Sequence, residues 1–219
     1  LLNQIQANET SGHVVINEVN TGGGDHIELY NYGTSINLNG WKWYWHDNRG
    51  YSNTYILPNI TLNSGSFLKI RENNGSNTNT VIYMGHNMMW TASGSNGIAG
   101  ELRNNNNSVI DFFRTAGDNT NPTGGTGWSS PNIPYPVTSN VARRTSDNDT
   151  DTGSDWAVGG SITDNALNPG QSGSGSSNDL INGSRSLSSY NNNKYICSGN
   201  AIFNNATVTG PGKIMVGGN

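Results

Sequence analysis

The stretch Asp25–Trp45, DHIELYNYGTSINLNGWKWYW, decides the fold. In its first part, apolar and polar side chains alternate, so Ile27 and Leu29 point to one face of an extended chain. This period of two predicts a half-buried strand. Gly33 then supplies a tight turn, where a residue without a Cβ adopts positive φ at little cost. The alternation resumes at Ile36, so the stretch predicts a hairpin of two strands joined at Gly33.

The same stretch ends in the most aromatic part of the chain. Alternation puts Trp41, Trp43 and Trp45 on one face and Tyr44 on the other. Such a row forms a core, an interface with another subunit, or a platform on which sugar rings stack. We favour core or interface, and the candidate interface residues of this stretch are Trp43, Tyr44 and Trp45.

Outside this stretch the chain keeps the same character over its 219 residues. Hydrophobic residues make up 32% and charged residues 12%, and the net charge is −4. Short alternating packets with turn signals about every 8 to 12 residues, and no amphipathic helix of useful length, predict an all-β sandwich or barrel. Further strands are predicted at residues 14–19, 54–57, 66–71, 80–84, 108–114 and 139–144, and residues 46–53 are predicted to be turn-like.

Composition divides the chain into an extended N-terminal arm, a β-sandwich domain, a Ser/Gly/Asn-rich linker and a C-terminal β-hairpin, at residues 1–13, 14–170, 171–193 and 194–219. A two-stranded hairpin is marginally stable alone, so it should pair with its own domain, with a neighbouring molecule or with a continuation absent from this chain. The apolar candidates for that contact are Ile202, Phe203, Val208, Ile214 and Val216.

Charge and cysteine content exclude some functions. The isoelectric point is about 5.4 and Lys and Arg do not cluster, which argues against a nucleic-acid partner. The single cysteine, Cys197, allows no intramolecular disulfide. No apolar run approaches the length of a membrane span. Because the chain starts at Leu1 and is rich in Asn, Ser and Thr, we expect a secreted or cell-surface protein whose signal peptide has been removed.

Several short motifs follow one another in a fixed order along residues 14–170. They are VINEV at 15–19, DHIELYNYG at 25–33, LNGW at 38–41, YILP at 55–58, LNSGSFL at 62–68, VID at 109–111, the arginines at 143–144, DTD at 149–151, DW at 155–156 and NPG at 168–170. Together they resemble the lamin-tail domain family of bacteria. The resemblance implies an immunoglobulin-like β-sandwich that serves as a non-catalytic module of secreted, surface or scaffold proteins.

An Asp-rich loop is the sharpest chemical feature. Its carboxylates recur at alternate positions, as oxygen ligands do in calcium loops, and the candidate ligands are Asp147, Asp149, Asp151 and Asp155. However, Gly153 falls one place later than in an EF-hand, and no Glu follows at the closing position. The alternative is an acidic surface turn, so calcium is the one cofactor that the sequence suggests.

Candidates for catalysis are weak. Glu18 and Glu28 lie on neighbouring predicted strands, where a carboxylate pair could hydrolyse a glycoside. We favour polar strand positions that bond to the backbone or to His26. The histidines lack metal-ligand spacing and are expected on the surface or in loops: His13, His26, His46 and His86. No nucleophile elbow precedes a helix. The sequence therefore predicts no enzyme.

These observations predict a secreted structural protein, a subunit of a filament-like extracellular or cell-surface assembly. Its terminal segments would add strands to the sheet edges of neighbouring copies, so the expected partner is the chain itself, as an oligomer or polymer. The alternative is a glycan-binding or adhesion module, accessory to a secreted enzyme or adhesin, that contacts glycan through Trp43 or Tyr44.

Overall fold

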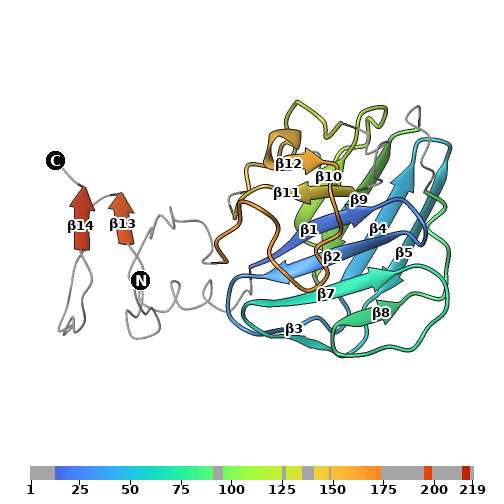
Figure 1. The fold of residues 1–219 in the computed structure, drawn as a ribbon, viewed down its shortest axis with the longest axis horizontal. Helices are drawn as coiled ribbons and strands as arrows, with labels where there is room; N and C mark the ends of the chain where they lie inside the picture. Colours follow the sequence, from blue (N-terminus) through green and yellow to red (C-terminus); the bar gives the residue numbers. More distant parts are fainter. Residues whose placement is uncertain are drawn as a thin grey trace. The chain divides into compact units, whose positions relative to one another are not determined.

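A computed structural model of the chain describes residues 13–90, 96–124, 127–134, 141–147 and 149–173, together with two strands nearer the C-terminus (Figure 1). The chain divides into two compact units. One is Ser11–Gly173, and the other combines Leu1–Thr10 with Ser174–Asn219. Among the described residues, no helix is long and apolar enough to cross a membrane.

The unit Ser11–Gly173 contains two main sheets. The large sheet has the strand order β12-β11-β1-β2-β7-β8, with β1 (Val14–Asn20), β2 (His26–Asn31), β7 (Ser66–Arg71), β8 (Val81–Tyr83), β11 (Val141–Arg144) and β12 (Trp156–Val158). The small sheet has the order β10-β9-β4-β5, with β4 (Lys42–Asp47), β5 (Tyr51–Ile56), β9 (Ile98–Arg103) and β10 (Val109–Arg114). A minor pair, β3 (Ile36–Asn37) and β6 (Thr61–Leu62), and the 3-10 turn η2 (Gly153–Asp155) complete the unit.

The two sheets pack face to face around one core, so the predicted all-β, immunoglobulin-like sandwich is confirmed. In Figure 1 the large sheet lies in front of the small one. The tryptophan row of β4 points inward: the side chains of Trp43 and Trp45 are 0% and 1% exposed. Trp43 stacks on Phe113 of β10, with ring centroids 6.3 Å apart, and meets Trp90 edge to face at 6.2 Å. The row therefore forms the centre of the core.

The hairpin predicted around Gly33 is wrong, because the opening stretch crosses from one sheet to the other. β2 pairs with β1 and β7, so both of its edges are already occupied, and β4 belongs to the small sheet. The turn after β2 is held by the buried Asn31, whose Oδ1 accepts from Gly33 N (3.0 Å) and whose Nδ2 donates to Leu62 O (2.9 Å). The positive φ occurs at Gly40 (77°), just before β4, rather than at Gly33.

The turn-like segment predicted at 46–53 is also wrong, since most of it is strand. β4 continues to Asp47 and β5 starts at Tyr51, which leaves a short hairpin turn with Gly50 at φ 92°. β5 pairs with β4 along its whole length, although Asn53 is of a residue type depleted in strands. The strands predicted at 66–71 and 108–114 are confirmed as β7 and β10.

The second unit contains β13 (Tyr195–Ser198) and β14 (Ile214–Gly217), which pair in parallel. The predicted hairpin pairs residues 202–208 with 213–216, and it stays a prediction because its first strand lies outside the described residues. Ile214 and Val216 lie on β14, as expected for a strand. Three other residues expected to make strand contacts lie outside the described residues: Ile202, Phe203 and Val208. Residues 1–12 of the predicted arm also lie outside them.

Candidate functional site

The outer face of the large sheet is covered by residues 159–173, which we call the covering segment (Figure 1). Sequence alternation predicts a half-buried β2, yet every residue of β2 is buried. The covering segment explains this: Asn165 N donates to Glu28 Oε2 (2.8 Å), and Tyr30 Oη donates to Gly173 O (3.1 Å). The compact unit accordingly extends to Gly173, into the segment expected to be a linker.

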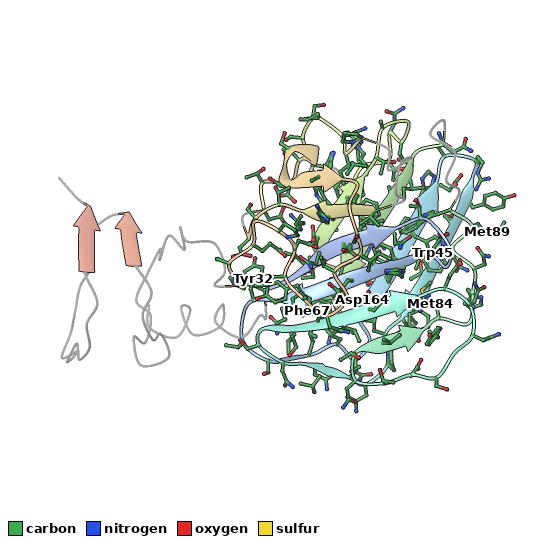
Figure 2. The ribbon with its side chains drawn as sticks, viewed as in Figure 1. Tyr32, Trp45, Phe67, Met84, Met89 and Asp164 are labelled. Carbon is green, nitrogen blue, oxygen red and sulfur yellow. The ribbon has the colours of Figure 1, made fainter. Side chains whose placement is uncertain are left out.

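A row of charged side chains lies under the covering segment. Glu18 of β1 faces Glu28 of β2 across the ladder, and Glu28 faces Lys69 of β7. The covering segment binds each of the three. Asn165 N donates to Glu28 Oε2, Thr163 N and Oγ1 donate to Glu18 Oε2 (3.0 and 2.9 Å), and Asp164, labelled in Figure 2, forms an ion pair with Lys69. The predicted placement of Glu18 and Glu28 on neighbouring strands is thus confirmed.

Burial dominates the electrostatics of this row. It raises the pKa of Glu28 to about 7 and also raises that of Glu18, although hydrogen bonds from the covering segment oppose both shifts. Glu18 and Glu28 are fully buried, so a sugar chain does not reach them in this structure. The geometry favours their interpretation as polar strand positions that hold the covering segment.

His26 belongs to the same cluster, so the expectation of a surface or loop histidine is wrong at this position. Its side chain is 3% exposed, and burial lowers its pKa to about 4. One ligand atom each of Glu18, His26 and Asp164 lies within 4.8 Å of the others. Sequence spacing could not reveal this group, because its members come from β1, β2 and the distant covering segment.

The four predicted calcium ligands do not all meet at one point. Asp147 Oδ2 accepts from Ser172 N (3.0 Å), whereas Asp155 closes the turn at η2 by accepting from Thr150 N (2.7 Å). Asp149 and Asp151 do cluster, and they do so with Asp111 of β10, which sequence reasoning missed. The reason is distance along the chain: nothing local in the sequence connects β10 with the Asp-rich loop.

Arg144 already provides the positive charge at this acidic cluster. Its Nη2 donates to both oxygens of Asp111 (2.9 and 2.8 Å) and to Asp149 Oδ2 (3.0 Å). Its guanidinium also lies over the Trp156 ring, 4.9 Å from the centroid. Both partners then bind the β1 bulge, because Arg144 Nε donates to Ile16 O (2.8 Å) and Asp111 Oδ2 accepts from Ile16 N (2.6 Å). This buried pair joins the two sheets.

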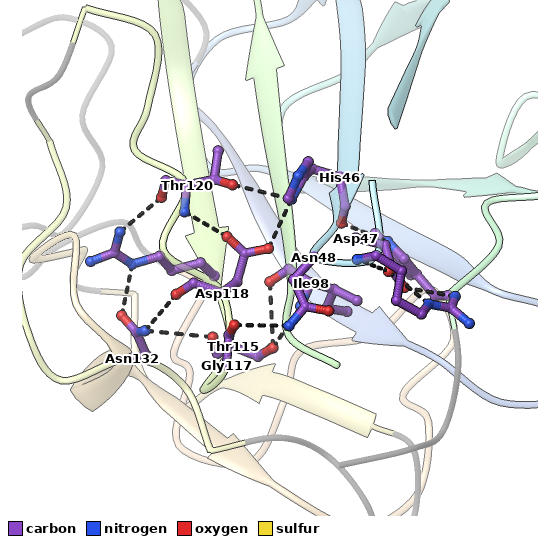
Figure 3. Close-up of polar contacts among 12 residues, drawn as sticks. His46, Asp47, Asn48, Ile98, Thr115, Gly117, Asp118, Thr120 and Asn132 are labelled. Atoms are coloured by element: carbon purple, nitrogen blue, oxygen red, sulfur yellow. Dashed lines mark hydrogen bonds and ion pairs between the residues drawn. The ribbon is translucent and has the colours of Figure 1, made fainter. Parts of the chain in front are cut away.

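His46, at the end of β4, contacts the loop that follows β10 (Figure 3). Its Nδ1 lies 2.8 Å from Asp118 Oδ2 and 3.1 Å from Thr120 Oγ1. A catalytic triad places its carboxylate and nucleophile on opposite ring nitrogens, whereas here both groups face Nδ1. Asn132 Nδ2 donates to Asp118 O (3.1 Å), and Arg114 Nη1 donates to Thr120 O (2.8 Å). The arrangement is that of an anchor for the loop.

β5 presents an open strand edge at one end of the small sheet. β5 ends the small sheet, pairs with β4 alone, and contains no charged residue and no proline. Tyr51 and Ile56 at its two ends are 47% and 61% exposed. At the other ends of the two main sheets, β8 and β12 have three residues each, and three of the six residues of β10 are buried. Native proteins usually protect such an edge with charge, proline or a bulge.

The aromatic candidates of β4 divide between the two faces of the small sheet. Trp43 and Trp45 lie in the core, so they offer no surface for a sugar or a partner. Tyr44 lies half-buried on the outer face, where Arg103 of β9 stacks over its ring at 5.3 Å. Tyr44 is thus the member of the predicted trio that remains accessible.

The two packed sheets and their shared aromatic core define an immunoglobulin-like sandwich module. The chain belongs to the lamin tail domain family, whose model matches residues 7–117. A search of curated proteins finds no match. The resembling motifs at 143–170 lie beyond the matched residues but within the same compact unit, Ser11–Gly173.

Proposed function

We propose that this protein is a non-enzymatic, secreted structural subunit that assembles with copies of itself by β-strand addition. The observation that carries the proposal is the open edge of β5. An added strand gains affinity from main-chain hydrogen bonds and specificity from alternating side chains. Because the donor and acceptor surfaces differ, the contact would be head-to-tail and would propagate as a filament.

The pairing pattern identifies the backbone groups that would accept a strand. Leu57 N donates to Trp41 O (2.8 Å), so the backbone N–H of Leu57 points toward the β4 side of the strand. By antiparallel alternation, the backbone groups of Ser52, Thr54 and Ile56 then point to the open side. Thr54 N is covered by the side chain of Asn53 (2.8 Å to Oδ1), a local contact that an incoming carbonyl could replace.

The second unit supplies the candidate donor. β13 and β14 form a two-stranded parallel sheet with four residues in each strand. Two-stranded sheets of this size are marginal in water and need further partners. In the proposed assembly, this apolar C-terminal segment, which includes Ile214 and Val216, pairs with β5 of a neighbouring copy.

A charge placed on the open edge tests the proposal. Lys at an edge position blocks strand addition without affecting the existing ladder. We expect sedimentation velocity and electron microscopy to show oligomers or filaments for the full chain, and monomers for Thr54→Lys. Asn106→Lys, which adds the same charge in the exposed turn between β9 and β10, serves as the matched control and should assemble normally. A full chain that stays monomeric at high concentration would refute the proposal.

The alternative function, glycan binding, now depends on Tyr44 alone. A glycan array that detects binding by the full chain, abolished in Tyr44→Ala with an unchanged unfolding transition, would favour this module over the assembly subunit. Equal binding by both proteins would exclude Tyr44 as the contact.

A further inference from the structure

Three side chains with metal-binding groups meet where the covering segment crosses β1 and β2. Glu18 and His26 lie on the same face of the sheet, because Glu18 faces Glu28 across the ladder and His26 is two residues before Glu28. Asp164 approaches from the covering segment (Figure 2). One ligand atom of each residue lies within 4.8 Å of the others.

Two buried atoms of this cluster lack partners. Within the described residues, neither Glu18 Oε1 nor His26 Nε2 has a hydrogen-bond partner, although the two side chains are 0% and 3% exposed. A buried polar atom without a partner is costly, and each such atom in a folded protein calls for an explanation. A shared ligand would satisfy both atoms at once.

The other polar atom of each side chain, His26 Nδ1 and Glu18 Oε2, is held by a hydrogen bond, as is typical of metal ligands in proteins. His26 Nδ1 lies 3.1 Å from Gly24 O, which holds the ring in the tautomer that leaves Nε2 with a free lone pair. Glu18 Oε2 accepts from Thr163 N and Oγ1, which orients the carboxylate and leaves Oε1 free. Metal-ligating histidines typically donate their other N–H to a carbonyl, and ligating carboxylates are themselves hydrogen-bonded.

We propose that Glu18, His26 and Asp164 bind a divalent metal ion of the zinc class, with Glu18 Oε1 and His26 Nε2 as its buried ligands. One imidazole nitrogen with two carboxylates suits Zn²⁺, whereas Mg²⁺ and Ca²⁺ prefer oxygen ligands alone. Three protein ligands leave a position for water. The inference does not depend on the proposed assembly function.

Asp164 is the ligand whose side chain would move when the metal ion binds. Bonds to zinc of about 2.0–2.2 Å require the ligand atoms to move closer together than 4.8 Å. The Asp164 side chain is 58% exposed and lies on the solvent side of the cluster, so it can move and gives the ion an entry path. Lys69, paired with Asp164, is the competing cation, and an arriving metal ion would displace its ammonium group.

Calorimetric titration of the untagged, EDTA-stripped full chain with ZnCl₂ tests the site. We expect one ion per chain, no comparable binding of Mg²⁺ or Ca²⁺, and zinc affinity lowered at least about tenfold in Asp164→Asn. Because Asp164 is exposed, this variant should fold, and its unfolding transition without metal checks that it does. His86→Gln, which removes an exposed histidine outside the cluster, is the matched control and should bind zinc as the original chain does.

Two further measurements make the assignment specific. Long-range ¹H–¹⁵N NMR of the imidazole rings should show zinc shifting Nε2 of His26 and not Nδ1, and Lys69→Gln should bind zinc more tightly because the competing ammonium is gone. The proposal is overturned if the full chain shows no saturable zinc binding, if Asp164→Asn binds as well as the original chain, or if His86→Gln loses binding to the same extent.

Discussion

At the scale of single residues, the Arg144–Asp111 pair shows how a buried charge is retained. Both side chains are almost completely inaccessible. Together they satisfy the N–H and C=O of Ile16, which lies next to the β1 bulge and beyond the residues of β1 that pair with β11. Burial alone would favour a neutral Asp111, and the guanidinium opposes that effect. The pair thus replaces strand pairing at the bulge.

We predict that removing one partner of the Arg144–Asp111 pair strongly destabilises the fold. Arg144→Met leaves an unpaired carboxylate and an unbonded Ile16 carbonyl in the core, and should lower the free energy of unfolding by about 3–5 kcal/mol. Urea denaturation measures this loss. Arg144→Met combined with Asp111→Leu should cost clearly less than the sum of the two single substitutions, since no charge then remains buried. Additive losses would show that the two residues act independently.

A second residue-scale prediction concerns pH. Burial, and next to it the charge of Glu72, raises the pKa of Asp25 to about 7, above the ordinary value of 3.8. The folded state then holds the proton more tightly than the unfolded state, so this contribution to stability is complete below about pH 4 and is lost as pH rises toward 7.

Asp25→Asn removes that dependence while keeping an oxygen that can accept from Trp90 N. In EDTA, denaturation at a series of pH values should show the variant gaining on the original chain between pH 4 and 7, by up to about 4 kcal/mol. The opposite slope, or a constant difference, would mean that Asp25 is not the group that titrates.

At the scale of elements, β9 packs against the tryptophan row through a position that has no side chain. A Cβ at Gly100 would overlap Trp43 Cη2 and lie 2.6 Å from Phe113 Cε1. Since core atoms are close-packed, even one methyl group must displace these rings. Gly100 is therefore required by the space that Trp43 occupies.

Gly100→Ala should accordingly lower the free energy of unfolding by about 1–3 kcal/mol, as overpacking of a core does. Thermal unfolding followed by near-ultraviolet circular dichroism would report both the loss and the disturbed indole environment. In a Trp43→Phe background, which lacks the outer indole ring, the same substitution should cost less. An equal cost in both backgrounds would assign the effect to the backbone rather than to Trp43.

Elements with a regular pattern could be predicted from the sequence, and those set by distant contacts could not. β7 and β10 alternate or are apolar, and both were expected. β5 was expected only in part, because its first residues are polar, yet it pairs with β4 along its whole length. Full burial of β2 was missed because the residues that cover it follow more than a hundred positions later.

The candidate sites follow the same rule. The Trp row was expected as core or interface, since alternation alone shows that its rings share one face. The Asp-rich loop suggested local calcium ligands, but Asp111 and Arg144 reorganise it from other elements. The cluster of Glu18, His26 and Asp164 has no sequence signature, because its ligands come from three segments that only the fold brings together.

At the scale of the whole molecule, the covering segment has a consequence for how the domain is made. Thr163 binds Glu18 from 145 positions away, and Asn165 binds Glu28 from 137. During synthesis on the ribosome, the carboxylates of β1 and β2 emerge long before the covering segment that binds them. Contacts between residues so distant in sequence form slowly, so we expect the covering segment to dock late in folding. A fragment ending at residue 117, where the family match ends, would stop short of the covering segment and of β11 and β12.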